Sequence, residues 1–508
     1  MDFLFNHLLS IILFFPAFSA ILIVFLPNGE DKLARWTAFI ASLMPFALTL
    51  VLWSNFDANM AGTFQFEESY VWYAAINSNF HIGVDGISLS MVLLTTLLTP
   101  LAILASFNIK DKVKAYMMLF LFLEMGMLGV FMSMDLLIFF VFWEIGLVPM
   151  YFLINQWGSD NRNYASLKFL IYTMGGSLGL LLAIQLLGVL FGTYDLAAIV
   201  EGWNALEGST IVMGMEVATI KTITFWAFVV AFAIKVPVWP FHTWLPDAHT
   251  EAPVAGSMIL AGVLLKLGAY GFIRLVLPLY PAESAHFAGW LAFLAVMAIV
   301  FGAFGAYGQW DFKRLVAYSS VNHMGFVLLG IAAAAKAPGT MSAHIAMNGA
   351  ILQMFNHGIS AAAMFFLVGV IYDRTHTRDL KRYGGLFPLI PAFGGILIFA
   401  SMSSLGLPGL NGFVSEFLVV RGAWAELPAY TAAGMIGLLF TGAYILKGIK
   451  NVLHGPLNEE WAHGDHKISD INLREVLVMV PLMALMLSLG IAPAWLLSVI
   501  NNAVTALF

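Results

Sequence analysis

The sequence contains no cysteine and few charged residues. Without cysteine the chain can form no disulfide and no thiolate-held zinc or iron–sulfur site. Lys, Arg, Asp and Glu make up 10% of the residues, and the net charge of −6 gives no basic surface of the kind that binds nucleic acid. The sequence also has no Walker-type phosphate loop and no histidine spacing typical of a metal site. We therefore exclude nucleic-acid-binding proteins, P-loop ATPases and thiolate metalloproteins.

Apolar residues dominate the composition. Hydrophobic residues account for 61% of the chain and the mean hydropathy is +0.88, which is far more apolar sequence than a soluble core needs. About 20 apolar residues are enough for one helix to cross a hydrocarbon layer of roughly 30 Å. Apolar runs between short polar breaks predict fourteen membrane helices, at 4–26, 34–53, 84–108, 115–133, 136–155, 165–191, 222–241, 254–278, 286–308, 315–335, 343–371, 387–420, 429–449 and 475–500. Loops or short amphipathic pieces are expected in the longest polar stretches, at 54–83, 192–221 and 454–474. No linker divides the chain, so we expect one all-α polytopic membrane domain over residues 1–508.

The basic residues are distributed unevenly between the connections. Cytoplasmic loops of membrane proteins are rich in Lys and Arg. Sixteen of the 23 Lys and Arg residues fall in the odd-numbered connections, and four fall in the even-numbered connections or at helix ends. This alternation predicts that both termini lie on the non-cytoplasmic side and that the loop at 374–382 is cytoplasmic. Of the other three, Lys447 lies near a helix end, where snorkelling is expected, while Lys235 and Lys266 lie deep.

Six ionisable side chains lie within the predicted membrane helices. Such groups are costly at this depth, so they are functional candidates. They lie on six different helices and are Glu144, Lys235, Lys266, His323, His357 and Glu416. Burial disfavours the charged form of a lysine and a nearby carboxylate stabilises it, so Glu144 could switch Lys235 between holding and releasing a proton. The other lysine and the two histidines would relay the proton, because histidine titrates near neutrality, and the second glutamate would be the last carrier.

Some of these residues also have a purely structural interpretation. Glu144 and Lys235 could form a buried pair that only fixes packing. His323 and His357 could each be a hydrogen-bonded packing residue, which is as plausible for them as the relay. Asp135, outside this set, follows a short break and is expected to mark the start of a helix.

Two of the predicted membrane helices are interrupted. Pro237 and Pro240 interrupt the segment KVPVWPFHTWLP, and Pro408 and Gly409 interrupt GLPGLNGF. Interrupted helices in corresponding halves are typical of transport sites in inverted-repeat folds. The two segments are five predicted helices apart, and an odd number inverts the topology. We therefore expect two inverted five-helix repeats, helices 4–8 at residues 115–278 and helices 9–13 at residues 286–449.

Four segments carry a resemblance to a known family. They are FWEIGLVPMYFLINQWG (142–158), FAIKVPVWPFHTWLPDAHTEAPVAGSMILAGVLLKLGAYG (232–271), DFKRLVAYSSVNHMGF (311–326) and GLPGLNGFVSEF (406–417). These segments resemble the antiporter-like membrane subunits of respiratory complex I, the NADH–quinone oxidoreductase. The resemblance implies about fourteen helices with two inverted repeats, and a subunit of an enzyme that couples electron transfer from NADH to quinone to proton export across the bacterial inner membrane. Sister subunits L and N carry a lysine where this chain has Glu416, and L has a long lateral helix beyond the point where this chain ends.

The resemblance also implies roles for the six residues. The first two, Glu144 and Lys235, match the charged pair of the input half, Lys266 the central lysine and Glu416 the helix-12 carboxylate, with the two histidines connecting them. The family's FMN, iron–sulfur clusters and quinone site lie in other subunits, so this chain would hold no cofactor or metal. Its partners would be the neighbouring subunits L and N and the lipid bilayer.

Two alternatives stay open at this stage. One is a subunit of a multi-subunit sodium/proton antiporter, and the other is a scaffold that only anchors its neighbours. The lysines and histidines favour protons, because hard metal cations prefer oxygen ligands. Six ionisable positions within the membrane argue against a scaffold.

Overall fold

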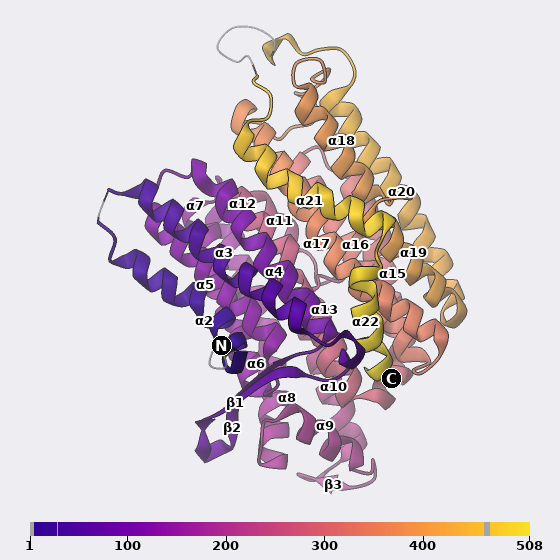
Figure 1. Ribbon diagram of the computed structural model, residues 1–508. Coiled ribbons are helices and arrows are strands. Elements are labelled where there is room, and N and C mark those ends of the chain that lie inside the picture. Colours follow the sequence, from indigo (N-terminus) through magenta and orange to yellow (C-terminus); the bar gives the residue numbers. More distant parts are fainter. Residues whose placement is uncertain (1–4, 28, 462–467, 508) are drawn as a thin grey trace.

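The computed structural model describes residues 5–27, 29–461 and 468–507, and these are almost entirely helical (Figure 1). Among these residues, twelve helices are long and apolar enough to cross a membrane. The predicted all-α membrane architecture is confirmed, whereas the count of fourteen is not. The other two predicted spans form a helix of 17 residues, and a pair of helices of 15 and 16 residues on either side of a break. Part of the predicted loop at 454–474, residues 462–467, lies outside the described residues.

The helices follow the predicted spans, and several of them are subdivided. The N-terminal part contains α2 (Leu8–Val24), α3 (Asp31–Asn55), α4 (Gly86–Ala105), α5 (Val113–Met132), α6 (Leu136–Ile145), α7 (Leu147–Trp157), α8 (Arg162–Phe191), α9 (Leu196–Ala205), α10 (Val217–Lys235), α11 (Trp244–Glu251), α12 (Val254–Ile259), α13 (Leu265–Gly271) and α14 (Leu277–Leu279). The C-terminal part contains α15 (Pro281–Gly308), α16 (Phe312–Lys336), α17 (Met341–Thr375), α18 (Pro391–Leu405), α19 (Asn411–Glu426), α20 (Pro428–Leu453), α21 (Leu473–Ile491) and α22 (Ala494–Leu507). The Asp135 carboxylate accepts from the backbone N–H groups of Leu137 and Ile138 and caps α6, which confirms the helix start expected there.

The polar stretch at 54–83 contains a β-hairpin, which the sequence analysis did not predict. Strand β1 (Gln65–Tyr73) pairs antiparallel with β2 (Ser78–Val84), and Asn77 makes the turn with a φ of +51°. Asn tolerates this left-handed conformation better than most residues. The hairpin lies in the lower part of the molecule in Figure 1, and a second pair of short strands, β3 (Ile211–Val212) and β4 (Met215–Glu216), follows later in the chain. Aromatic and β-branched residues in SYVWY favour a strand, although hydropathy alone marked the segment only as polar.

The helices that carry the candidate residues 266, 323 and 357 form the centre of the molecule. The most apolar windows of Val254–Leu279 and of α17 are completely buried by protein, whereas those of α3, α8 and α20 are only 39% buried. The outer helices therefore present apolar side chains to their surroundings, as helices in lipid do. Placement on central helices keeps these polar side chains away from lipid, where they would be costly.

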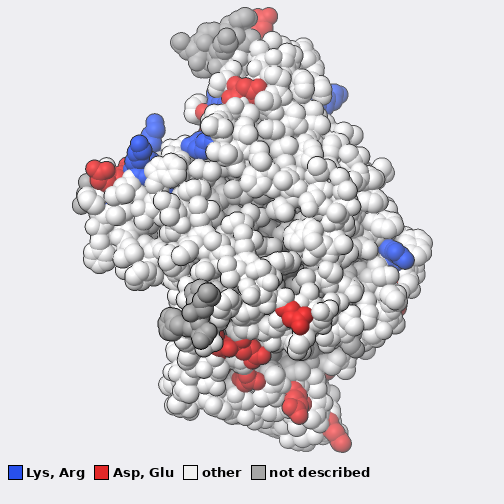
Figure 2. Space-filling view, viewed as in Figure 1, with Lys and Arg blue, Asp and Glu red and all other residues white. Residues whose placement is uncertain are grey.

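Charged side chains gather at the two ends of the molecule. Figure 2 shows most of the visible Lys and Arg toward the upper end, around the loops next to α7 and α18, together with some Asp and Glu. Toward the lower end of the same face, around the hairpin and below it, only Asp and Glu are visible. On this face the molecule thus has an end with most of the visible Lys and Arg, which we call the basic end, and an acidic end, with an apolar band between them, as expected for a membrane protein whose two sides face different compartments.

Candidate functional site

Four buried polar side chains form a file through the centre of the molecule. The Nζ atom of Lys266 lies 2.8 Å from Nδ1 of His357, and Nδ1 of His323 lies 2.6 Å from Oε1 of Glu416. The two imidazole rings lie next to each other with their centroids 5.7 Å apart. None of the four residues is more than 4% exposed. We call these four residues the central file; they come from α13, α17, α16 and α19.

Hydrogen-bonding capacity indicates which atoms of the central file donate. A protonated Lys266 can only donate, so His357 accepts at Nδ1 and carries its proton on Nε2. An ionised Glu416 can only accept, so His323 donates from Nδ1. Among the described residues, Nε2 of His357 and Oε2 of Glu416 are buried and have no hydrogen-bond partner. Buried polar atoms are usually hydrogen-bonded, so these two atoms have hydrogen-bonding capacity that the described residues do not use.

Close helix contacts place Lys266 next to His357. A Cβ atom on Gly358 would lie 2.8 Å from the carbonyl oxygen of Gly262, so the two helices approach each other more closely than larger residues would permit. Lys266 lies one turn after Gly262, and His357 directly precedes Gly358. Two π-helical turns, Leu260–Leu264 and Phe272–Val276, flank α13. Such turns are frequent at functional sites, and here the first one supplies the carbonyl of Ala261, which accepts from the Lys266 ammonium group.

A set of polar side chains orients the far end of the central file. The Nε2 of Gln353 donates to Oε1 of Glu416 at 3.0 Å, and Ser415 donates to Gln353 Oε1 at 2.5 Å. The Tyr444 hydroxyl lies 3.4 Å from Nε2 of His323, on the side of the ring away from the carboxylate. Both ring nitrogens of this histidine therefore have a partner, which holds the ring in one orientation.

Glu144 and Lys235 lie in the first half of the chain and are not in ion-pair contact. The Lys235 ammonium lies over the ring of Trp143, 5.0 Å from its centroid, and no carboxylate oxygen of the described residues lies within 4.0 Å of it. Its Cβ atom packs on Gly268, two residues from Lys266, because a Cβ on that glycine would be 3.0 Å away. Glu144 is half-buried, and its Oε1 has no partner among the described residues. The two charges are thus separate in this structure, and Lys235 lies beside the helix that begins the central file.

The predicted helix breaks flank two of the charged residues. At the first break, α10 ends at Lys235, and Pro237 and Pro240 lie in the turn before α11. In the second break, Pro408 and Gly409 lie between α18 and α19, and Gly409 has a φ of +95°. This left-handed conformation favours glycine.

The second break is tied to the central helix α17. The Asn356 Nδ2 donates to the carbonyl of Asn411 at 2.7 Å, and Ser403 donates to the Asn411 side chain at 2.5 Å. Interrupted backbone inside a membrane is tolerated when protein groups satisfy it in this way. The break can therefore hold Glu416, on the second turn of α19, in a fixed position next to α17.

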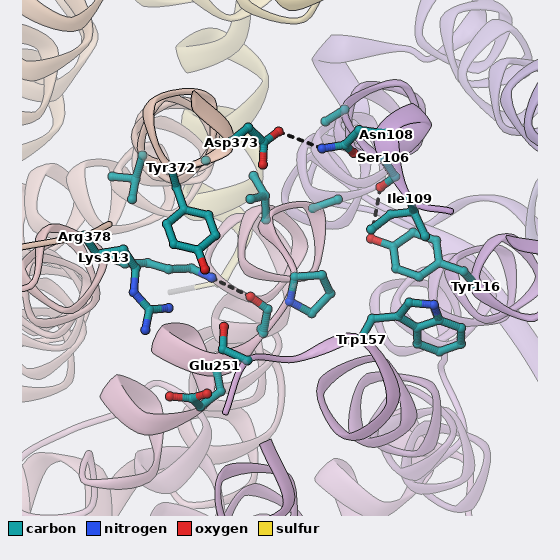
Figure 3. Close-up of a pocket in the computed structure, with 18 residues that line it drawn as sticks. Ser106, Asn108, Ile109, Tyr116, Trp157, Glu251, Lys313, Tyr372, Asp373 and Arg378 are labelled. Carbon is teal, nitrogen blue, oxygen red and sulfur yellow. Dashed lines mark hydrogen bonds between the residues drawn. The ribbon is translucent and has the colours of Figure 1, made fainter. Parts of the chain in front are cut away.

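A cavity of about 150 Å³ lies at the basic end of the same helices, beside the junction of α11 and α12 (Figure 3). Its polar lining comes from several elements and includes Ser106, Asn108, Tyr116, Glu251, Lys313, Tyr372, Asp373 and Arg378. The Lys313 ammonium donates to the Ala252 carbonyl, and Asn108 donates to Asp373 at 2.7 Å. The cavity thus contains both acidic and basic groups next to a break in the helix.

One face of α17 connects the cavity to the central file. Tyr372 lines the cavity, Phe365 lies two turns earlier, and His357 lies two turns before that, so the three share a face. The ring of His249 stacks on Phe365, with centroids 4.3 Å apart. Both ring nitrogens of His249 are buried and have no hydrogen-bond partner among the described residues. An imidazole with two free nitrogens therefore lies between the cavity and the central file.

The sequence analysis identified all four members of the central file but missed several of their neighbours. It did not single out His249, Gln353, Tyr444 or Lys313. The signal for His249 was its place in the specific string WLPDAH, close to an interrupted helix. No sequence signal pointed to Gln353 or Tyr444, because their role depends on which helices pack together. A further acid, Glu124, is completely buried on α5, and neither of its carboxylate oxygens has a partner among the described residues.

The fold and the central file define a class of membrane protein. Residues 133–445 match the family described as NADH:quinone oxidoreductase/Mrp antiporter, TM. The chain therefore belongs to this family of antiporter-like membrane subunits.

Individual relatives show which members of this family the chain is similar to. The chain is 39% identical to the NADH-quinone oxidoreductase subunit M of Rhodobacter capsulatus, over 99% of this chain and 96% of that protein. It is 38% identical to the NADH-ubiquinone oxidoreductase chain 4 of Arabidopsis thaliana, over 98% and 96% of the two chains. These relatives confirm the resemblance seen in the sequence.

Solved structures agree with the fold. A chain of respiratory complex I from Thermus thermophilus superposes with a TM-score of 0.85 at 26% identity, covering 98% of both chains. A chain of the Mrp complex from Dietzia sp. DQ12-45-1b superposes with a TM-score of 0.83 at 21% identity, covering 99% of this chain and 97% of that one. The second likeness concerns the fold alone.

Proposed function

We propose that this chain is the proton-translocating membrane subunit of an NADH:quinone oxidoreductase. The observation that carries the proposal is the central file, in which Lys266, His357, His323 and Glu416 lie in sequence across four helices. Each of the four side chains can hold and release a proton, and none of them is a redox group. The chain would therefore contribute proton transfer to the enzyme, while electrons move elsewhere.

The hydrogen bonds indicate how one proton can move along the central file. Lys266 passes a proton to Nδ1 of His357, which makes the lysine neutral and the histidine an imidazolium ion. His357 releases the proton from Nε2 toward His323, through a ring rotation or a bridging water. His323 accepts it at Nε2 and gives up its Nδ1 proton to Glu416. The file returns to its starting state when Glu416 releases a proton, Lys266 takes one up, and the two imidazole rings rotate so that the proton again lies on Nε2 of His357 and on Nδ1 of His323. Histidine suits the two middle positions because its two nitrogens allow a proton to arrive on one side and leave on the other.

Two features of this chain are candidates for delivering protons to Lys266. Lys235 packs on Gly268 close to Lys266, and approach or withdrawal of Glu144 would change how strongly Lys235 holds its proton. The cavity near Lys313 provides polar groups at the basic end of the molecule, and His249 lies between it and the central file. In this account Lys235 and Glu144 control loading, and the cavity gives access from the basic side.

The proposal also covers the orientation of the chain in the membrane and its partner subunits. The excess of Lys and Arg at one end favours a cytoplasmic position for that end, with both termini on the other side of the bacterial inner membrane. FMN, iron–sulfur clusters and the quinone site belong to partner subunits, since this chain has no cysteine to hold a cluster. The neighbouring partners would be subunits L and N, and the two inverted repeats, residues 115–278 and 286–449, would carry Lys235 and Glu416 at corresponding breaks.

Recovery of the chain from native membranes tests the proposal. Purification in mild detergent through a tag on the full chain should recover it together with subunits that contain FMN and iron–sulfur clusters. Recovery only with small membrane proteins would contradict the proposal and favour a sodium/proton antiporter. In reconstituted vesicles, NADH oxidation should acidify one compartment at the same rate with or without sodium. Acidification that requires sodium would also count against a proton-only file.

A further inference from the structure

An open groove at the basic end of the molecule lies apart from the central file. It lies between the ends of α15 and α20 and has a volume of about 820 Å³. Two aromatic residues, two lysines and a histidine are among its lining residues: Tyr307, Trp310, Lys447, Lys450 and His454. None of the described residues that line it is acidic. The groove is therefore basic and aromatic in character.

Three lysines lie at this groove, and the ammonium groups of two of them share one aromatic ring. The Nζ of Lys447 lies 4.1 Å from the centroid of the Trp310 ring, and Nζ of Lys381 lies 4.8 Å from the same centroid. Lys450 is exposed and lies one turn after Lys447. In the part of the chain that the structure describes, no carboxylate oxygen lies within 4.0 Å of any of these three groups. Like charges at such distances repel each other, so an anion in the groove would be favoured.

The position of Lys447 is fixed by the protein. Its ammonium group donates to the carbonyl oxygens of Tyr307 at 2.6 Å and Gln309 at 2.7 Å. These bonds hold the positive charge at the end of α15, next to the two aromatic rings, instead of leaving it on a mobile side chain. The groove thus has at least one pre-positioned cation and two exposed aromatic residues, Tyr307 and Trp310, which are 48% and 44% exposed.

An exposed apolar stripe leads from the groove along α20 toward the middle of the apolar band. Ile436, Leu439 and Leu446 are 50%, 74% and 55% exposed. With Ala443 they follow one another at intervals of three and four residues, and the next position in the same series is Lys450. This spacing places them on one face of the helix. Fourteen residues of helix span about 21 Å, which exceeds half of a hydrocarbon core of roughly 30 Å.

We propose that this groove binds the phosphate headgroup of an anionic phospholipid, whose acyl chain lies along the stripe on α20. Lysines near a membrane surface attract anionic headgroups, and Trp and Tyr prefer the level of those headgroups. A free phosphate ion would use only the lysines, whereas a lipid also uses the apolar stripe that begins beside them. The combination of a basic groove with a continuous apolar stripe favours the lipid.

The test uses the purified complex that contains the full chain, stripped of weakly bound lipid. Phosphatidylglycerol is titrated against the wild-type complex and against a Lys381→Gln/Lys450→Gln variant, and bound lipid is counted by native mass spectrometry. Both lysines are exposed and lie outside the central file, so the variant should assemble. We expect the affinity to fall about fivefold for each lysine, or roughly 25-fold for the pair. Zwitterionic phosphatidylcholine should bind equally weakly to both complexes.

Two controls make the test decisive. A Lys32→Gln/Lys110→Gln variant removes two exposed basic residues of the same end that lie outside the groove, and it should bind phosphatidylglycerol as the wild type does. Inorganic phosphate at millimolar concentration should not displace the lipid. Equal loss of binding in both double variants, unchanged binding in the Lys381→Gln/Lys450→Gln variant, or displacement by inorganic phosphate would each overturn the proposal.

Discussion

Nδ1 of His323 lies 2.6 Å from Oε1 of Glu416, and this contact joins α16 to α19 just after the second helix break. Gln353 on α17 donates to the same carboxylate oxygen at 3.0 Å. Three helices therefore converge on a single carboxylate in the second half of the molecule. Glu416 also lines a pocket that contains the break residues Gly406 and Pro408.

Replacement of Glu416 tests its role as a proton carrier. Glu416→Gln keeps the shape of the side chain and one oxygen that can accept from His323 and Gln353, but it removes the carboxylate that takes up and releases a proton. We expect a severalfold loss of proton pumping per NADH oxidised, with assembly intact. Pumping is measured as fluorescence quenching of a pH-sensitive dye in inverted vesicles. Glu201→Gln, at an exposed position on α9, is the matched control and should pump normally. Unchanged acidification in the Glu416→Gln complex would refute the carrier role.

Lys235 and Glu144 should matter although they are not in contact. Lys235→Ala or Glu144→Ala removes one of the two charges that would control loading of Lys266, so we expect severalfold slower proton pumping in complexes that still assemble. The proton-to-electron ratio is compared with that of Lys336→Ala, which removes an exposed lysine at a helix end. A normal ratio in the assembled Lys235→Ala complex would remove this lysine from the path.

The glycine contact next to the central file gives a steric prediction. Gly358→Ala places a Cβ atom 2.8 Å from the Gly262 carbonyl oxygen, so α17 must move away from the helix that carries Lys266. Overpacking of this kind costs about 1–3 kcal/mol, and the added distance between Lys266 and His357 should slow pumping. Gly175→Ala is the control, since its Cβ meets nothing within 4 Å. Thermal unfolding and pumping are measured for both, and equal behaviour would contradict the tight contact.

The hairpin should respond to pH through His81, which lies outside the membrane-spanning helices. Its Nδ1 lies 3.2 Å from Asp195 Oδ2, and its Nε2 lies 3.1 Å from Glu67 Oε2. The hydrogen bond with Asp195, helped by the one with Glu67, raises the pKa of His81 above its usual value of 6.5, against the effect of partial burial. The same bond lowers the pKa of Asp195.

The sign of the pH effect follows from these two shifts. The contribution of His81 is complete below its unfolded-state pKa and is lost as the pH rises through the higher folded-state value. That of Asp195 is present above its unfolded-state pKa and is lost only as the pH falls through the lower folded-state value. We expect amides of β2 to be less protected from hydrogen exchange at pH 9 than at pH 6, by up to about 1 kcal/mol for such partly exposed pairs. In His81→Gln this difference should disappear, and its persistence would contradict the assignment.

The sequence predicted the membrane architecture for two reasons. A membrane helix needs an apolar run of a known length, and charged residues are rare within such runs because burying them is costly. The same cost is enough to identify Lys266, His323, His357 and Glu416 as candidates from their positions in the sequence. The contacts between them could not be predicted, because they depend on a close helix approach at Gly262 and Gly358 and on two π-helical turns. Hydropathy reports how deeply a residue is buried, but not which residue of another helix it meets.

Other features of the structure were also not predictable from hydropathy. The hairpin at 65–84 was missed because the sequence analysis classed this stretch only as polar. Without a regular alternation of apolar and polar residues, neither the strands nor their pairing can be predicted. The count of fourteen spans depended on two segments of marginal length, one of them the interrupted helix that leads to Glu416. The inverted repeats, 115–278 and 286–449, stay a prediction, as do the roles of the six ionisable residues.

The most direct test of the central claim is the proton-to-electron ratio of the assembled complex with Lys266→Ala. Lys266 begins the central file, and alanine leaves His357 without its donor. The ratio is measured in sealed vesicles at matched rates of NADH oxidation, beside wild type and Lys336→Ala. Our account predicts a clear fall in protons moved per electron in Lys266→Ala alone. An unchanged ratio in a fully assembled Lys266→Ala complex would contradict the account.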